Sequence, residues 1–455
     1  MSALRRSVAR GAVLLAAVGA LAVGGVGPLP AAAIASPAAT SSAAWTVVTS
    51  PNPSSKASLS GVSCFTAGAC WAVGVEGGSG GAEVPFTEET SGTGWSLISS
   101  PEVGGALQAV SCVSSAACEA VGVQASTTVW GATLVERYAT GGWSVVSTPA
   151  TSSGNGDLTG VACVSTSDCW AVGAQVTSSN GAIRAPLVEH YNGSSWSIAT
   201  AANADGGLSA VTCVSASDCW AAGYQTVAGN QTGLVERYTG ASWSVVSSPT
   251  VSAYLDSVAC LNASACSAGG KDVLEQWNGT AWQVAAQPSG VLLGMACASA
   301  AAECWAVGGS TDVLVEEYAG GAWTVTAGVT NPQPTGFSFA ELEAVACGDS
   351  SECVAVGSTN ESSSGASSGQ TLVEDHAVAP GSATAAPAPT PTPSASATVT
   401  PTATPAASAS ASPTSAPTTS TGGSFPWALL LVVCVVVVAA AAGGRLGIRR
   451  RTARR

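Results

Sequence analysis

The sequence predicts an all-β protein, a seven-bladed β-propeller of four-stranded antiparallel blades. Three observations lead to this prediction. A unit with two cysteines occurs seven times, the first cysteines of successive units lie 37 to 51 residues apart, and the unit's last strand is missing from the end of the array but present before its beginning. A repeat of this length is typical of a propeller blade. With Gly 53 and Pro 23 turns are frequent, and the 14 tryptophans fit one position repeated in many copies.

The first predicted strand of each unit is apolar and ends in cysteine. It reads, in order, LSGVSC from Leu59, LQAVSC from Leu107, LTGVAC from Leu158, LSAVTC from Leu208, LDSVAC from Leu255, LLGMAC from Leu292 and LEAVAC from Leu342. We expect the leucine, an apolar residue and the cysteine to share one face of this strand, because alternate residues of a strand point the same way. A short loop leads to a second strand, which reads CWAVG in three of the units and is similar in the others.

The third and fourth predicted strands carry a recurring glutamate and a tryptophan. The third reads LVERY from Leu134, with related runs in the later units and a weak match, PFTEET, from Pro85 in the first. The fourth reads WSVV or similar, and in the middle units it follows turns such as Asn192-Gly193 and Asn278-Gly279. Asn-Gly is a strong hairpin signal because both central turn residues must tolerate positive φ. Each unit therefore predicts a four-stranded meander.

The two ends of the array predict that it closes into a ring. The fourth-strand tryptophan Trp45 precedes the first cysteine, whereas the seventh unit runs from LVEDH at Leu372 into a Pro/Ala/Ser/Thr tract without a tryptophan strand of its own. We expect the strand at Trp45 to be the outer strand of the last blade. Circular closure requires this offset, whereas a linear stack would need caps at both ends.

The run CWAVGG…LVEEYAGGAWTV, with glycine after the second strand and a Tyr before a Trp, resembles kelch-type propeller repeats. The resemblance covers about residues 45–380, and it departs from kelch in keeping one glycine in most units and in adding cysteine pairs. It implies a binding scaffold. A secreted copper oxidase is an exception among kelch-like proteins, but its site needs Tyr, His and Cys together. This chain has only His190 and His376, in the repeat positions of Arg237 and Tyr238, so we expect no cofactor.

The segments outside the repeats predict export and a membrane anchor. Arg5, Arg6 and Arg10, an apolar run and Ala33-Ile34-Ala35 form the layout of a signal peptide, residues 1–35. The remaining predicted segments are a short lead (36–44), the propeller (45–380), a Pro/Ala/Ser/Thr-rich stalk (381–424), one transmembrane helix (425–444) and a basic cytoplasmic tail (445–455). The arginines of the tail favour the cytoplasmic side. The predicted location is the cell membrane, single-pass, with the body extracellular.

Fourteen cysteines in the repeats predict seven disulfides, because an exported chain meets an oxidising environment. Each pair would close its own first hairpin. The predicted pairs are Cys64–Cys70, Cys112–Cys118, Cys163–Cys169, Cys213–Cys219, Cys260–Cys266, Cys297–Cys304 and Cys347–Cys353. Zinc is the alternative interpretation, and it would need ligands from two blades, since a zinc site takes three or four and no histidine is near. We expect no metal.

The acidic residues predict structure rather than catalysis. A glutamate recurs in nearly every unit, at Glu136, Glu189, Glu236, Glu275, Glu316 and Glu374. A catalytic pair would be unique to one cleft, so we interpret this set as a structural ring and assign no catalytic residue. Asp168 and Asp218 each precede a cysteine, and we expect them to serve the hairpin turn.

The charge distribution argues against nucleic acid as a partner. Residues 36–424 contain all 27 acidic residues of the chain. Their basic residues are only Lys56, Arg137, Arg184, Arg237 and Lys271. Binding to a phosphate backbone needs a basic stripe, which this segment does not have.

The meander predicts which end of the ring binds a ligand. Loops between the second and third strands share one end with the blade-to-blade segments, and these vary in length and composition. The ligand-face candidates there are Trp130, Arg184, Tyr224, Tyr254, Phe337 and Phe339. We expect a membrane-anchored binding module for an extracellular protein or glycan. The alternative is a surface polysaccharide hydrolase or lyase using unique acids such as Glu83, Glu102, Asp157 or Asp205.

Overall fold

A computed structural model describes the repeat region of the chain. The described residues are 45–377 without 78–81, 92–93, 126–130, 179–183, 204, 250–253, 289, 299–300, 310–312, 327–336, 349–351 and 364–365. Within this part of the chain no helix is long and apolar enough to cross a membrane. The predicted signal peptide, lead, stalk, membrane helix and cytoplasmic tail lie outside the described residues, as do residues 378–380.

The described residues form seven separate four-stranded antiparallel sheets, as the repeats predict. We number the sheets as blades 1 to 7 and give their strands from the inside outward. Blades 1 and 2 consist of β2 (Ala57–Thr66), β3 (Ala69–Gly77), β4 (Glu83–Ser91) and β5 (Trp95–Ile98), then β6 (Gly105–Ser114), β7 (Ala117–Gln124), β8 (Thr133–Ala139) and β9 (Gly142–Val146). Blades 3 and 4 consist of β10 (Gly156–Ser165), β11 (Asp168–Val176), β12 (Arg184–Tyr191) and β13 (Trp196–Ala199), then β14 (Gly206–Ser215), β15 (Asp218–Val227), β16 (Asn230–Tyr238) and β17 (Trp243–Val245).

The last three blades follow the same order, including the fifth, which has the shortest unit. Blades 5 and 6 consist of β18 (Leu255–Asn262), β19 (Ala265–Gly270), β20 (Val273–Trp277) and β21 (Trp282–Ala286), then β22 (Val291–Ala298), β23 (Glu303–Gly309), β24 (Val313–Ala319) and β25 (Ala322–Thr326). Blade 7 consists of β26 (Phe337–Cys347), β27 (Glu352–Ser363), β28 (Ala366–Ala377) and β1 (Trp45–Val48).

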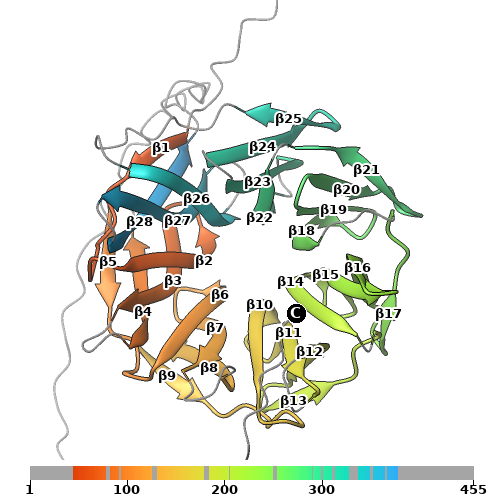
Figure 1. Cartoon of the computed structure of the whole chain (residues 1–455), viewed down its shortest axis with the longest axis horizontal. Coiled ribbons are helices and arrows are strands. Elements are labelled where there is room, and N and C mark those ends of the chain that lie inside the picture. The colour runs from red at the N-terminus through yellow and green to blue at the C-terminus, as the bar shows by residue number, and fades with distance from the viewer. Residues whose placement is uncertain are drawn as a thin grey trace, which may run out of the picture. The chain divides into compact units, whose positions relative to one another are not determined.

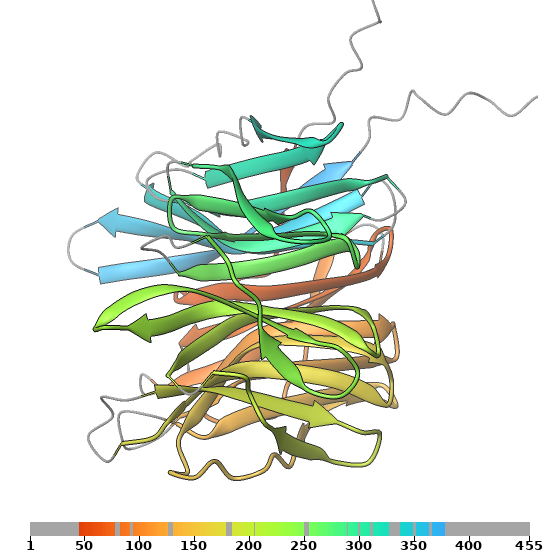
Figure 2. The ribbon, with the colours of Figure 1, turned by 90° about the vertical axis from the view of Figure 1, so that its right-hand side faces the viewer.

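The ring is closed by the strand that precedes the first unit. Strand β1 pairs with β28 in antiparallel register, Trp45 opposite His376. Each inner strand contacts the inner strands of both neighbouring blades, and β26 contacts β2, so the circle is complete. Figure 1 shows the inner strands around the centre, and Figure 2 shows the blades packed face to face from the side. The prediction of closure by the N-terminal strand is confirmed.

The inner strands correct one detail of the sequence interpretation. Leu59 and Val62 are three residues apart, so regular alternation would place them on opposite faces of β2. Both nevertheless belong to one buried cluster between blades 7 and 1. A register shift between Leu59 and Gly61 allows this, because a bulge takes one residue out of the alternation. The same shift follows the leucine in all seven inner strands.

The glycine that ends the CWAVG motif is required by close contact between strands. Gly173 lies opposite Leu158 at the bulge, and a Cβ built on Gly173 would overlap the backbone oxygen of Asp157. The corresponding glycines of the other blades meet a backbone oxygen of their own inner strand in the same way. An alanine there would have to displace backbone, which cannot move as easily as a side chain.

We therefore expect Gly173→Ala to lower the free energy of unfolding by about 2 to 4 kcal/mol, at the upper end of the cost of overpacking. Gly142→Ala is the matched control, since a Cβ there meets nothing within 4 Å, and its effect should stay within about 0.5 kcal/mol. Urea unfolding of both variants measures the difference. Equal midpoints for the two variants would show that the contact at the bulge is not what excludes a side chain.

The recurring glutamates form the structural ring that the sequence predicts, and the structure adds Glu88 from the weakly matching first unit. The seven carboxylates are 0–1% exposed. Several hold the segment arriving from the preceding blade: Ser50 donates a hydrogen bond to Glu88 at 2.8 Å, and Ser100 donates one to Glu136 at 2.7 Å. Burial raises the pKa of Glu88 and Glu136 to about 7. Glu88 and Glu136 thus join consecutive blades through the linkers.

Candidate functional site

The seven hairpins between first and second strands each contain a disulfide, in the pairing that the sequence predicts. We call this end of the ring the hairpin face; it also contains the turns between third and fourth strands. The opposite end, formed by the ends of the second strands, the starts of the third strands and the blade-to-blade linkers, is the variable face. Seven disulfides indicate an oxidising environment, because thiols stay reduced in the cytosol.

Three of the six predicted ligand-face residues have described side chains. Trp130 lies outside the described residues, and Phe337 and Phe339 fall on β26 with side chains that the structure does not describe. Tyr224, Tyr254 and Arg184 remain, on three consecutive blades. For Trp130, Phe337 and Phe339 the role in ligand binding stays a prediction.

Tyr224 and Tyr254 meet at the junction of blades 4 and 5. Their ring centroids are 5.7 Å apart with an interplanar angle of 81°, an edge-to-face arrangement. Tyr224 lies on β15, and Tyr254 directly precedes β18 and is 41% exposed. Edge-to-face packing fixes the two rings relative to each other while leaving ring surface accessible. The pair is an aromatic platform on the variable face.

Arg184 does not lie free on the variable face but is paired with an acid of its own blade. Its guanidinium donates a hydrogen bond to Asp157, so an ion pair joins the first and third strands of blade 3, with both side chains about one quarter exposed. Asp157 lies opposite Ala174, and a Cβ built on Gly207 would lie 3.2 Å from the Ala174 Cβ and 3.0 Å from a ring carbon of Tyr224. The ion pair and the aromatic platform are therefore close neighbours.

Sequence reasoning missed a central channel, a cavity of about 170 Å³ lined by all seven inner strands. Three consecutive residues of each inner strand line this cavity. The first of the three follows the recurring leucine at the bulge, and these first residues are Ser60, Gln108, Thr159, Ser209, Asp256, Leu293 and Glu343. The signal was present in the sequence, because this position differs in nearly every unit while its neighbours repeat. An interpretation based on regular alternation does not detect this signal, because only the bulge turns the residue after the leucine toward the channel.

The two carboxylates of the channel, Asp256 and Glu343, have raised pKa values. Burial raises the pKa of Asp256 to about 6, and burial together with the charges of Glu341 and Asp256 raises the pKa of Glu343 to about 7. The side chains lining the cavity include no lysine or arginine. Among the described residues, no group of three or more His, Cys, Asp or Glu side chains is arranged to hold a metal ion.

The acids before the second cysteines have a role different from the predicted one. Asp218 accepts hydrogen bonds from Arg237 Nε at 2.8 Å and Nη2 at 2.9 Å, and Asp168 lies 2.8 Å from His190 Nε2. They bind the third strand of their own blade rather than the hairpin turn, because each is the first residue of its second strand. In blade 3 the turn is instead stabilised by Ser165, whose hydroxyl accepts from the Ser167 N–H at 3.2 Å.

Comparison with solved structures shows the propeller fold alone. The chain is similar to the WD40 repeats of RRP9, with a TM-score of 0.51, 10% identity and coverage of 74% of this chain and 99% of that chain. It is also similar to U3-55K, with a TM-score of 0.50, 9% identity and coverage of 73% and 98%. YCF48 from Cyanidioschyzon merolae matches with a TM-score of 0.46, 14% identity and coverage of 73% and 99%. The kelch resemblance stays a prediction.

Neither a protein-family model nor a curated protein sequence matches the chain. The fold, a seven-bladed propeller, is therefore known from the structure and not from a sequence match. It is a scaffold that generally serves as an interaction module through the loops of one face.

Proposed function

We propose that the chain is a membrane-anchored extracellular propeller that binds a protein or glycan partner at the cell surface through its variable face. The seven disulfides support an extracellular body, and the signal-like start, the stalk and the apolar segment 425–444 support the anchor. A rigid ring raised on a stalk presents one face to partners outside the cell.

The observation that carries the proposal is the aromatic platform of Tyr224 and Tyr254. Two blades contribute one ring each, and the exposed ring of Tyr254 can stack on the apolar face of a sugar or on a peptide side chain. The neighbouring Arg184–Asp157 pair offers charged donors and acceptors to hydroxyl or amide groups. Stacking next to directional hydrogen bonds is the usual composition of a binding site.

Arrays of cell-wall glycans and of surface proteins, probed with the purified chain, test the proposal. We expect at least one specific ligand, and we expect Tyr254→Ala to weaken its binding about tenfold, which corresponds to about 1.4 kcal/mol for one stacking contact. Leu97→Ala is the matched control, because Leu97 is 46% exposed on the outer strand of blade 1, whereas the platform lies on blades 4 and 5. It should bind as the unmodified chain does.

If Tyr254→Ala and Leu97→Ala bind the ligand with equal affinity, the binding surface lies elsewhere. Turnover of a polysaccharide by the purified chain, without stable binding, would favour the hydrolase or lyase alternative over the binding module.

A further inference from the structure

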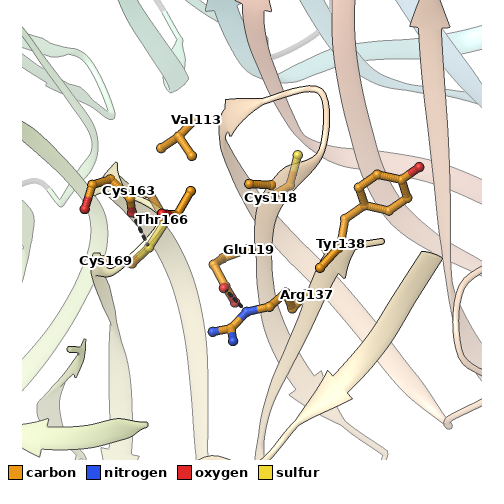
Figure 3. A pocket seen from close by; sticks show the side chains of 11 residues that line it. Val113, Cys118, Glu119, Arg137, Tyr138, Cys163, Thr166 and Cys169 are labelled. Carbon is orange, nitrogen blue, oxygen red and sulfur yellow. Dashed lines mark hydrogen bonds and ion pairs between the residues drawn. A yellow bond between two sulfur atoms is a disulfide. The ribbon is translucent and has the colours of Figure 1, made fainter. Parts of the chain in front are cut away.

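A cavity of about 170 Å³ opens between blades 2 and 3 on the hairpin face. Blade 2 contributes Val113, Glu119 and Arg137 to its wall, and blade 3 contributes the Cys163–Cys169 hairpin. Figure 3 shows the head groups of Glu119 and Arg137 at one end of the space, with Val113 and Thr166 across it. The cavity lies at the opposite end of the ring from the variable face, so it goes beyond the proposed function.

Four other blade junctions show which side chain occupies this place. In four blades the residue after the second cysteine is a tryptophan, 0–4% exposed, and these residues are Trp71, Trp170, Trp220 and Trp305. Each packs its indole against aromatic side chains of the next blade. At the junction of blades 1 and 2, Trp71 lies 4.5 Å from the Tyr138 ring and 5.3 Å from the Trp143 ring. The indole is a wedge between blades.

Blade 2 has lost two of the large side chains that fill the preceding junction. There Phe65 and Trp71 belong to one packed cluster with Cys112 and Cys118. One unit later the corresponding residues are Val113 and Glu119, which face the Cys163–Cys169 disulfide. The cavity therefore occupies space that aromatic rings fill one blade earlier.

The junction of blades 7 and 1 supports this relation between tryptophan and cavity. Its second strand has Val354 in the tryptophan position, and a cavity of about 260 Å³ lies there. Its wall includes the acids Glu352 and Asp375, so its chemistry differs from that of the cavity between blades 2 and 3.

Arg137 replaces the indole only in part. Its guanidinium carbon lies 4.2 Å from the centroid of the Tyr191 ring, and its Nη1 donates to the Tyr191 hydroxyl at 2.9 Å. Its Nε donates to Glu119 Oε1, in a pair whose Glu119 side chain is 7% exposed. Within the described part of the chain, Glu119 Oε2 and Arg137 Nη2 are buried without a hydrogen-bond partner. An acceptor that is buried without a partner costs about 1 to 3 kcal/mol. A ligand's donor offsets this cost when rotation of the Glu119 carboxylate turns the oxygen toward the cavity.

We propose that this cavity binds the indole of a tryptophan side chain from a partner protein, with the indole N–H donating to the Glu119 carboxylate. The volume suits a ring, since an apolar cavity of about 150 Å³ binds benzene. The place suits an indole, because the repeats put one at the equivalent position of four other blades. The unpaired carboxylate oxygen favours a ring with a donor over a purely apolar ring.

Calorimetric titration of the purified full-length chain with N-acetyl-tryptophanamide tests the proposal. We expect saturable binding, and about tenfold weaker binding of N-acetyl-phenylalaninamide, because its ring has no donor for Glu119 and a tenfold change corresponds to one ordinary hydrogen bond. This comparison needs no variant. Equal affinities for the two amides would overturn the role of Glu119. If neither amide gives a heat of binding at concentrations up to about 10 mM, the proposed site would be overturned, because a weaker affinity has no functional use.

Val113→Phe is the decisive variant, because it restores the residue that Phe65 provides one unit earlier. We expect it to fill the cavity, to weaken N-acetyl-tryptophanamide at least about tenfold and to keep or raise the unfolding midpoint. Val164→Phe is the matched control: the same change at the equivalent position of blade 3, where Trp170 already fills the junction and Val164 is 37% exposed. Unchanged binding in Val113→Phe would place the ligand at another site.

Discussion

The folded chain is expected to be most stable near pH 4.5 to 5 and to lose stability steadily as the pH rises to about 7. The cause is the ring of buried glutamates. Burial raises the pKa of Glu88, Glu136, Glu189, Glu275 and Glu374 to about 7, and burial also raises the pKa of Glu236 and Glu316. In the unfolded chain the pKa of the same groups returns to the ordinary value of 4.5.

The direction follows from which state holds the protons. Between pH 4.5 and 7 the folded chain keeps these carboxyls protonated while the unfolded chain has released them, so raising the pH favours unfolding. Each group makes the free energy of unfolding fall with rising pH within this window and has no such effect well outside it. The channel acids Asp256 and Glu343, whose pKa values are also raised, act in the same direction. Urea midpoints measured from pH 4.5 to 8 give the profile.

One variant isolates a single member of the ring. Glu374 is 0% exposed, and neither of its carboxylate oxygens has a hydrogen-bond partner in the described part of the chain. Glu374→Gln removes the charge and keeps the shape, so at pH 8 we expect it to stabilise the fold by up to about 3 kcal/mol, and at pH 4.5 to change little.

Glu236 provides the contrasting control. Its two oxygens accept hydrogen bonds from the N–H groups of Ala202 at 3.0 Å and Asn203 at 2.9 Å. Glutamine has only one oxygen to offer, so Glu236→Gln should gain less at pH 8 and lose stability at pH 4.5. A midpoint that stays flat or rises between pH 5 and 8 in the unmodified chain would contradict the prediction that these carboxyls are protonated in the fold.

Reduction of the disulfides is expected to unfold the chain or to bring it close to unfolding. Each bond closes a loop with a sequence separation of six or seven residues. Loops of this size contribute roughly 2 kcal/mol each in the chain-entropy account. Seven such contributions reach the total free energy of unfolding of a typical domain, about 5 to 15 kcal/mol. Unfolding midpoints with and without a reductant, together with a count of free thiols, measure the effect.

A single pair gives the scale of the effect. Removing both cysteines of one hairpin, as in Cys260→Ala with Cys266→Ala, should cost roughly 2 kcal/mol, since only one loop is released. A non-reducing peptide map checks that each remaining cysteine is bonded to its hairpin neighbour. A fully reduced chain with an unchanged midpoint would show that strand pairing alone holds the hairpins.

The sequence by itself determined the number of blades, the order of their strands, the closure and the disulfide pairs. These properties depend on spacing along the chain. The two cysteines of each hairpin are so close in the sequence that a disulfide within the hairpin is the simplest arrangement. The tryptophan strand at Trp45 can complete a blade only beside the last unit. Because the unit is repeated, each assignment is supported by seven copies rather than by one.

The tertiary structure alone decided what the side chains meet. The bulge after each leucine turns Asp256 and Glu343 into a shared channel, and no local pattern shows a bulge of this kind. Tyr224 and Tyr254 lie 30 residues apart, and only the packing of blades 4 and 5 brings their rings together. The tryptophan replaced by Glu119 could be read from the sequence, but the resulting cavity could not. A space between blades depends on how two sheets pack, and packing is decided by contacts between units, not by the order of residues within one.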